Sequence, residues 1–274
     1  MTKKRIAFQG EPGAFSHAAS ANVFPGQDYV GCVTFEETLN AVQSGKADFA
    51  VVPVENSLYG RITDIHHLLP ESGLHIIGET YLRVEMTLLG VPGATLDDIK
   101  AVQSLSVALG QCRKFIASRG LRTINAVDTA GSAREIAQKA DKSVAAIASR
   151  FAGEIYGLNV LAENIEDADH NTTRFLVLSP TEQRAPNQGT VKTTFVFRVR
   201  NVPAALYKAM GGFATNGVNM TKLESYMVGG AFTATQFYAD IEGHPDDVSV
   251  QHAFEELGFF TDHFHILGVY PKAN

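Results

Sequence analysis

The pattern of apolar and polar positions along the N-terminal part of the chain predicts strands that alternate with helices. A short apolar run at residues 5–9 and a continuously apolar run at residues 49–54 are typical of buried parallel strands. Pro53 predicts either that the second strand ends at this residue or that the strand lies at the edge of its sheet, because proline donates no hydrogen bond to a neighbouring strand. Helices are predicted at residues 14–24 and after Thr34, which opens a Thr-x-x-Glu capping box.

The same alternation continues as far as residue 178. Extended segments are expected at residues 74–77 and 81–91. Further along, strands are predicted at residues 101–103, 123–127, 144–148, near 160 and at 175–178, and helices at residues 107–119, 130–140 and 150–157. Repeated alternation of strand and helix implies a mainly parallel sheet with helices on both faces.

The pattern changes after residues 180–189, which contain no large apolar side chain and are predicted to form a linker. Beyond the linker the expected order is strand, helix, two strands, helix, strand. These elements are predicted at residues 193–199, 204–214, 220–228, 231–241, 248–257 and 264–269, with Pro203 opening the first helix and Gly229-Gly230 turning a hairpin. The βαββαβ order is that of the α+β ferredoxin-like fold.

Composition and charge narrow the class of protein. With 45% apolar residues, the 274-residue chain can fill two hydrophobic cores. The net charge of −6 argues against binding to nucleic acid or to an anionic membrane surface. Cys32 and Cys112 are too far apart in sequence for a disulfide scaffold or a cysteine-based zinc site. No run approaches the roughly 20 apolar residues of a membrane span, so a cytoplasmic protein is expected.

Candidate chemistry gathers where predicted strands pass into helices. Glycine, hydroxyl and acidic residues occupy four such junctions, at residues 10–16, 55–60, 104–106 and 128–129. Free amide groups at helix N-termini bind anions, although each of these residues also has an ordinary use as a helix cap. Together with Asn171-Thr-Thr-Arg174, the four junctions predict a cleft for an acidic small molecule. His263 and His265 lack a third ligand nearby, and no metal site is expected.

Taken in order, these motifs resemble the prephenate dehydratase family. The resemblance rests on Gly10-x-x-Gly13-Ala-Phe-Ser16, Val52-Pro-Val-Glu55-Asn56-Ser57, Ser104 to Gln111-Cys112, Thr129-Ala130 and Asn171-x-Thr173-Arg174-Phe175. It implies a two-lobed, periplasmic-binding-protein-like (type II) catalytic domain at residues 1–180. Residues 191–274 resemble an ACT regulatory domain, joined to the first by a linker at residues 181–190.

The resemblance implies a lyase that converts prephenate to phenylpyruvate, losing water and carbon dioxide. Thr173 is the implied donor to the leaving hydroxyl, and Glu55 is our candidate for the proton source behind it. The predicted substrate-binding residues are Ser16, Asn56, Ser57, Ser104, Thr129, Ala130, Asn171, Arg174 and Phe175. No cofactor is implied, since the ring becomes aromatic and takes up the electrons itself.

Phenylalanine is the implied effector, and a homodimer or homotetramer formed through ACT domains is expected. The implied effector residues are Ala205, Leu206, Asn219, Met220, Glu224 and Ser225. The chain departs from the family where Leu105 replaces a usual histidine, and where Tyr226-Met227 replaces the usual Arg-Pro after Glu-Ser. Two alternatives stay open: an arogenate dehydratase, and a small-molecule sensor without catalysis.

Overall fold

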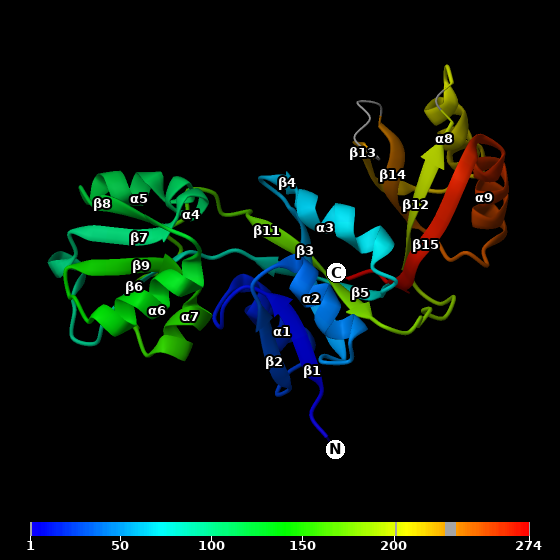
Figure 1. Ribbon diagram of the computed structural model, residues 1–274. Helices are drawn as coiled ribbons and strands as arrows, with labels where there is room; N and C mark the ends of the chain where they lie inside the picture. The colour runs from blue at the N-terminus through cyan, green and yellow to red at the C-terminus, as the bar shows by residue number, and fades with distance from the viewer. Residues whose placement is uncertain (1, 201, 228–233, 274) are drawn as a thin grey trace. The chain divides into compact units, whose positions relative to one another are not determined.

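The computed structural model describes residues 2–200, 202–227 and 234–273 (Figure 1). Packing divides the chain into two compact units. The N-terminal unit comprises Met1–Ile62 and Tyr81–Phe175, and the C-terminal unit comprises Thr63–Thr80 and Leu176–Asn274. Within the described ranges, no helix is long and apolar enough to cross a membrane.

One sheet of the N-terminal unit forms its first lobe. Strands β2 and β3 pair with β1 on either side, both in parallel, and β11 follows β3 in the sheet order. The elements of this lobe are β1 (Arg5–Gln9), α1 (Phe15–Val23), β2 (Asp28–Cys32), α2 (Phe35–Gln43), β3 (Phe49–Asn56), β4 (Gly60–Arg61) and the Thr172–Phe175 part of β11 (Thr172–Ser179). Half of the predicted capping box is present at the start of α2: the Thr34 side chain accepts a hydrogen bond from the Glu37 backbone N–H, whereas the Glu37 carboxylate accepts from the Val33 backbone N–H.

The expected end or edge position at Pro53 is wrong. Strand β3 runs on to Asn56 and lies in the interior of the sheet. Proline is tolerated there because pairing with β1 ends at Val51, two residues earlier. Its missing N–H therefore removes no hydrogen bond from that ladder.

A second sheet forms the second lobe, with strand order β10-β6-β9-β7-β8. Strands β8 and β9 pair with β7 in parallel, whereas β6 is antiparallel to β9 and β10. The elements are β6 (Thr87–Gly90), β7 (Ala101–Leu105), α4 (Ser106–Gln111), α5 (Arg113–Ser118), β8 (Arg122–Ala126), α6 (Thr129–Lys139), β9 (Val144–Ala148), α7 (Arg150–Tyr156) and β10 (Asn159–Ala162), with a 3-10 turn at Leu96–Asp98.

The single helix predicted at residues 107–119 is two helices. Cys112 leaves helical geometry, with φ −117° and ψ 25°, and separates α4 from α5. Its side chain is fully buried in the core of the second lobe. Burial raises the pKa of the Cys112 thiol to about 12, and the nearby Glu166 and Asp167 carboxylates add to the shift. The thiol therefore stays protonated near neutral pH, as is typical of a buried structural cysteine.

The C-terminal unit has the predicted βαββαβ order, and its four strands form an antiparallel sheet in the order β13-β14-β12-β15. The elements are β12 (Val191–Val199), α8 (Ala205–Thr215), β13 (Met220–Met227), β14 (Ala234–Glu242), α9 (Val248–Phe260) and β15 (Thr261–Pro271). Phe195 packs in its core against Phe213, with ring centroids 5.8 Å apart. The hairpin turn predicted at Gly229-Gly230 lies outside the described residues.

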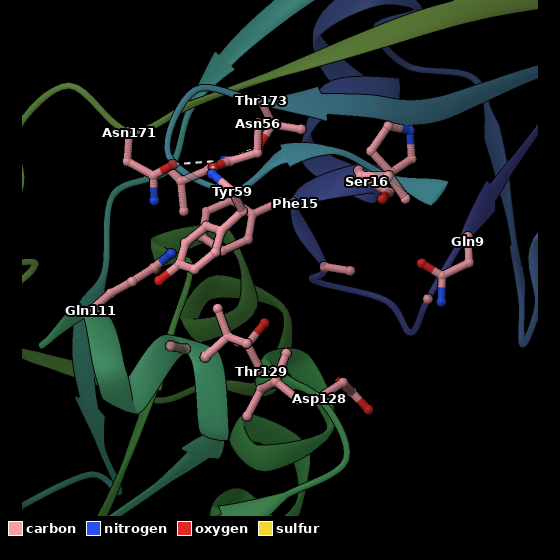
Figure 2. Close-up of a pocket in the computed structure, with 18 of the residues that line it drawn as sticks. Gln9, Phe15, Ser16, Asn56, Tyr59, Gln111, Asp128, Thr129, Asn171 and Thr173 are labelled. Atoms are coloured by element: carbon pink, nitrogen blue, oxygen red, sulfur yellow. Dashed lines mark hydrogen bonds between the residues drawn. The ribbon is translucent and has the colours of Figure 1, made fainter. Parts of the chain in front are cut away.

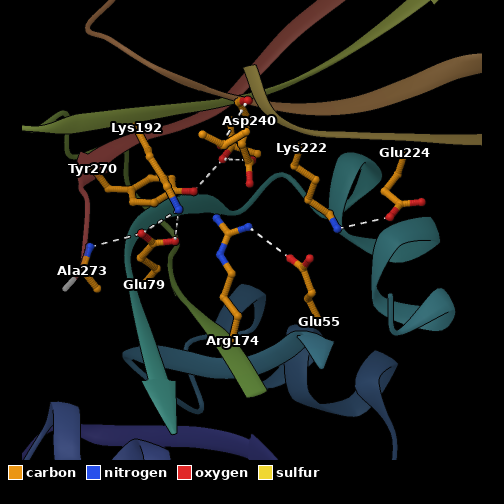
Figure 3. A network of polar contacts seen from close by, with 11 residues as sticks. Glu55, Glu79, Arg174, Lys192, Lys222, Glu224, Asp240, Tyr270 and Ala273 are labelled. Atoms are coloured by element: carbon orange, nitrogen blue, oxygen red, sulfur yellow. Dashed lines mark hydrogen bonds and ion pairs between the residues drawn. The ribbon is translucent and has the colours of Figure 1, made fainter. Parts of the chain in front are cut away.

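Residues 63–80 pack with this C-terminal unit, although the sequence pattern grouped them with the catalytic domain. They contain α3 (Thr63–Leu68), a 3-10 turn at Leu69–Glu71 and the first part of β5 (His75–Arg83), in which Ile76 pairs with Gly268 of β15. The Glu79 carboxylate, with its side chain fully buried, lies 3.0 Å from the Lys192 ammonium (Figure 3). This buried ion pair links β5 to β12.

Candidate functional site

A cavity of about 600 Å³ lies in the N-terminal unit and draws its walls from both lobes (Figure 2). The carboxyl end of β1 and the start of α1 contribute Gln9, Gly10 and Ser16, and β3 contributes Asn56. The second lobe contributes the β7–α4 junction and Thr129 at the start of α6. Ligands of parallel α/β sheets bind at such strand ends.

The Asn56 side chain connects three segments at this cavity. Its Nδ2 donates to Thr173 Oγ1 at 3.0 Å and to Asn171 Oδ1 at 2.7 Å. Its Oδ1 accepts from the backbone N–H groups of Leu58 and Tyr59, at 3.0 and 3.1 Å. The amide thereby fixes the segment ahead of β11, β11 itself and the loop after β3.

This network sets what the Thr173 hydroxyl can do. Thr173 is 8% exposed and lines the cavity, and its oxygen accepts from Asn56. The hydroxyl hydrogen is therefore left to donate to another acceptor. Asn171 Nδ2, also buried, has no hydrogen-bond partner among the described residues. Both groups can donate to oxygen atoms of a ligand.

The loop at residues 10–13 ties the two lobes together. Ser149 Oγ and Tyr156 Oη of the second lobe donate to the backbone carbonyls of Gly13 and Pro12, at 2.7 and 2.8 Å. Glu11 forms a two-pronged ion pair with Arg134, with N–O distances of 2.8 and 2.9 Å. Nearby, Glu11 and burial raise the pKa of the Tyr156 phenol, burial being the larger cause. The loop at residues 10–13 thus connects the cavity wall formed by the first lobe to the wall formed by the second.

The histidine after Ser16 supports the same loop from within. His17 stacks on Phe8, with ring centroids 4.7 Å apart, and its Nδ1 accepts from the Gly13 N–H at 3.1 Å. Burial lowers the pKa of His17, so the neutral ring that can accept this hydrogen bond is favoured. No motif or spacing in the sequence singles out His17.

Of the predicted substrate-binding or catalytic residues, six line the cavity together. They are Ser16, Asn56, Thr129, Asn171, Thr173 and Phe175. Ser57, Ser104 and Ala130 lie outside its lining. Ser57 Oγ donates to the His170 carbonyl, Ser104 Oγ donates to the Ile147 carbonyl within the second lobe, and Ala130 is fully buried.

Glu55 and Arg174 also lie outside the lining. Strand β11 begins at Thr172, not after Arg174, so Thr173 and Arg174 have opposite orientations. The same alternation separates Asn56 from Glu55 on β3. Arg174 Nη1 lies 3.5 Å from Glu55 Oε2 (Figure 3), and these two side chains pair with each other.

Other residues that line the cavity were not predicted from the sequence. Tyr59 and Gln111 add a phenol and an amide, and Phe15, Val84 and Met86 contribute to a largely apolar wall. Gln111 stands within a family motif, which was the available signal. Val84 and Met86 carry no chemical signal, because isolated apolar residues in an extended segment have the same pattern as core residues.

Comparison with known proteins agrees with this geometry. The sequence profile of prephenate dehydratase matches residues 6–183. The chain belongs to the prephenate dehydratase family. A bifunctional N-acyl-homoserine lactone acylase/prephenate dehydratase from Komagataeibacter europaeus is 49% identical, and the match covers 98% of this chain and 96% of that protein.

Two further relatives are an enzyme from a plant and a bacterial enzyme of known structure. An arogenate dehydratase/prephenate dehydratase from Arabidopsis thaliana is 39% identical, covering 98% of this chain and 72% of the relative. The crystal structure of prephenate dehydratase from Arthrobacter aurescens in complex with L-Phe superimposes with a TM-score of 0.89. That structure is 30% identical, with 98% of this chain and 90% of the other covered. Members of the family are hydro-lyases.

Substitution of Gly13 tests the loop that joins the lobes. A Cβ at Gly13 would lie 2.8 Å from Ala152 Cα, and its φ of +92° disfavours other residues. We expect Gly13→Ala to lower the free energy of unfolding by about 2–4 kcal/mol, measured by urea denaturation. Gly26→Ala is the control, because φ is +72° there but the space is open. Equal losses in both variants would show that the contact with Ala152 does not constrain the loop.

Proposed function

We propose that this chain catalyses the decarboxylating dehydration of prephenate to phenylpyruvate, a step toward phenylalanine. The supporting observation is the Thr173 hydroxyl, held by Asn56 at the wall of a cavity large enough for a small dicarboxylate. The chain's membership of the prephenate dehydratase family also supports this reaction.

The reaction sets clear demands on the protein. The bond between the ring and its carboxylate breaks, and that electron pair enters the ring as carbon dioxide leaves. The ring becomes aromatic as its C–O bond breaks, and the departing oxygen takes a proton to form water. The enzyme must therefore bind a dianion, donate a hydrogen bond to the leaving oxygen and keep bulk water out.

Thr173 is suited to donate that hydrogen bond. An aliphatic hydroxyl is too weak an acid to give up its proton outright near neutral pH, so Thr173 acts as an oriented donor or as a relay. Because the Asn56 N–H occupies one lone pair of Thr173 Oγ1, the direction of the donated hydrogen is restricted. The proposed role of Glu55 as the proton source requires a relay, since Glu55 lies outside the cavity lining.

The substrate carboxylates are held, in this proposal, by neutral donors. Asn171 Nδ2 and the Ser16 and Thr129 hydroxyls border the cavity, and the latter two lie in the first turns of α1 and α6. Backbone N–H groups at those helix N-termini add to the positive potential. Arg174 lies outside the cavity lining and pairs with Glu55, which connects β11 to β3.

We further propose that residues 191–274 form an ACT domain that binds phenylalanine as an inhibitor in an oligomer of the chain. The related Arthrobacter enzyme was solved with L-Phe bound. Ala205 and Leu206 begin α8, whereas Asn219 and Met220 follow its other end, about 15 Å away along the axis. Glu224 and Ser225 lie farther along β13. A site that uses both helix ends is best completed by a second copy.

A second activity is supported by the apolar wall. The relative from Komagataeibacter is named as an N-acyl-homoserine lactone acylase as well as a prephenate dehydratase. Phe15, Val84 and Met86 give the cavity a surface suited to an acyl chain. In such a hydrolysis, water adds to the amide carbonyl, and the C–N bond breaks to give a fatty acid and homoserine lactone.

The acylase activity is tested with a series of substrates of increasing chain length. We expect fatty-acid release, followed by mass spectrometry, with kcat/KM rising as methylene groups are added, because each buried CH₂ contributes about 0.8 kcal/mol. Protein denatured by heat is the control. Release no greater than in that control would exclude this second activity.

The proposed role of Thr173 is tested by removing its hydroxyl. We expect Thr173→Ala to lower kcat for prephenate by about 10² or more with KM little changed, because the hydrogen bond strengthens only as the hydroxide departs. Thr173→Ser should recover most of the rate. Thr172→Ala is the matched control, since that side chain points away from the cavity lining. A near-normal kcat in Thr173→Ala would refute the assignment.

Regulation is tested by adding the amino acid itself. We expect L-phenylalanine to lower the rate and to raise Tm, because a ligand that binds only the folded state stabilises it by RT ln(1 + [L]/Kd). D-phenylalanine is the control, and light scattering reports the oligomeric state in both. A rate and a Tm that do not respond to L-phenylalanine would contradict the proposed regulation.

A further inference from the structure

The charge inventory of the cavity is unusual for a site that receives a dianion. Of the described residues that line it, four offer amides, four offer hydroxyls, and most of the others are apolar. Asp128 alone among these lining residues carries a formal charge at neutral pH, and that charge is negative. The described lining therefore supplies no side-chain cation for the substrate.

Asp128 holds its place as the N-cap of α6. Its Oδ1 accepts from the Gly131 backbone N–H at 2.6 Å, and Ser132 Oγ donates to its backbone carbonyl at 2.7 Å. Asparagine or serine caps a helix as well as aspartate does. The cap thus accounts for a polar side chain at this position but does not require the negative charge.

The Arg134 guanidinium is engaged by another carboxylate. Arg134, on the same helix, is held in its two-pronged ion pair with Glu11. Asp128 and Glu11 both act electrostatically on Tyr156, in the direction opposite to Arg134. The formal charges of Glu11, Arg134 and Asp128 sum to −1.

Two substrates of this reaction differ in one group. Prephenate has a keto group beside its side-chain carboxylate and carries two negative charges. Arogenate has an ammonium group in that place and one net negative charge. A carboxylate in a largely apolar wall attracts an ammonium and repels a dianion, and the low polarity strengthens both effects.

We propose that Asp128 is a specificity-determining residue that favours arogenate over prephenate by facing the substrate ammonium group. This inference rests on the proposed dehydratase function and refines its substrate. The product of the favoured reaction is phenylalanine itself, formed with loss of water and carbon dioxide, because the amine is already present.

The experiment compares kcat/KM for arogenate and prephenate in the wild type and in Asp128→Asn. Asparagine retains the helix cap and removes only the charge. We expect the wild type to prefer arogenate, and the variant to lower the arogenate-to-prephenate ratio by about tenfold or more. The change should combine a loss for arogenate with a gain for prephenate, the gain being an effect that general damage to the site would not produce.

Asp141→Asn is the matched control. Asp141 also accepts from a nearby backbone N–H, that of Ser143 at 2.8 Å, but lies outside the cavity lining. The arogenate-to-prephenate ratio of kcat/KM in Asp141→Asn should stay at the wild-type value. If Asp128→Asn does not fold, Asp128→Ser supplies the same loss of charge with another preferred cap.

The outcomes separate the two proposals. A wild-type protein that converts neither compound refutes the dehydratase function and this inference with it. If the folded Asp128→Asn or Asp128→Ser variant keeps the wild-type arogenate-to-prephenate ratio of kcat/KM, the role of Asp128 is overturned. The dehydratase function is not affected by that result. A wild type that prefers prephenate also overturns the inference.

Discussion

The amide of Asn56 is the interaction on which the candidate site depends. One side chain, through two donated and two accepted hydrogen bonds, fixes Thr173, Asn171 and the loop that carries Tyr59. Few other side chains could replace it, because aspartate lacks the donors and leucine lacks both donors and acceptors. The orientation of the Thr173 hydroxyl is in this sense a property of Asn56.

A second constraint acts on the backbone rather than on a side chain. The loop at residues 10–13 enters the left-handed region at Gly10 and Gly13 and passes against Ala152 with no room for a side chain. Its carbonyl groups accept hydrogen bonds from the second lobe. On the side of the first lobe, two of these contacts are thus made by peptide carbonyls, whose positions are less variable than those of long side chains.

Much of this organisation can be predicted from sequence, and the failures have physical causes. Asn56, Asn171 and Thr173 stand in motifs, and the cavity brings them together as expected. The sequence analysis set the start of β11 three residues too late, so it did not foresee that Thr173 and Arg174 have opposite orientations. The packing of residues 63–80 depends on long-range contacts such as Glu79 with Lys192, for which no local pattern exists.

The course of the chain has a consequence for how this protein can be divided. Residues 63–80 leave the N-terminal unit, pack in the other unit and return, and strands β5 and β11 each contribute residues to both. A cut at the linker would leave β5 without its partner β15 and Glu79 without the Lys192 ammonium. Segments of the two units therefore alternate along the chain instead of following one another. For this reason, a single recombination crossover could not exchange either unit as a whole.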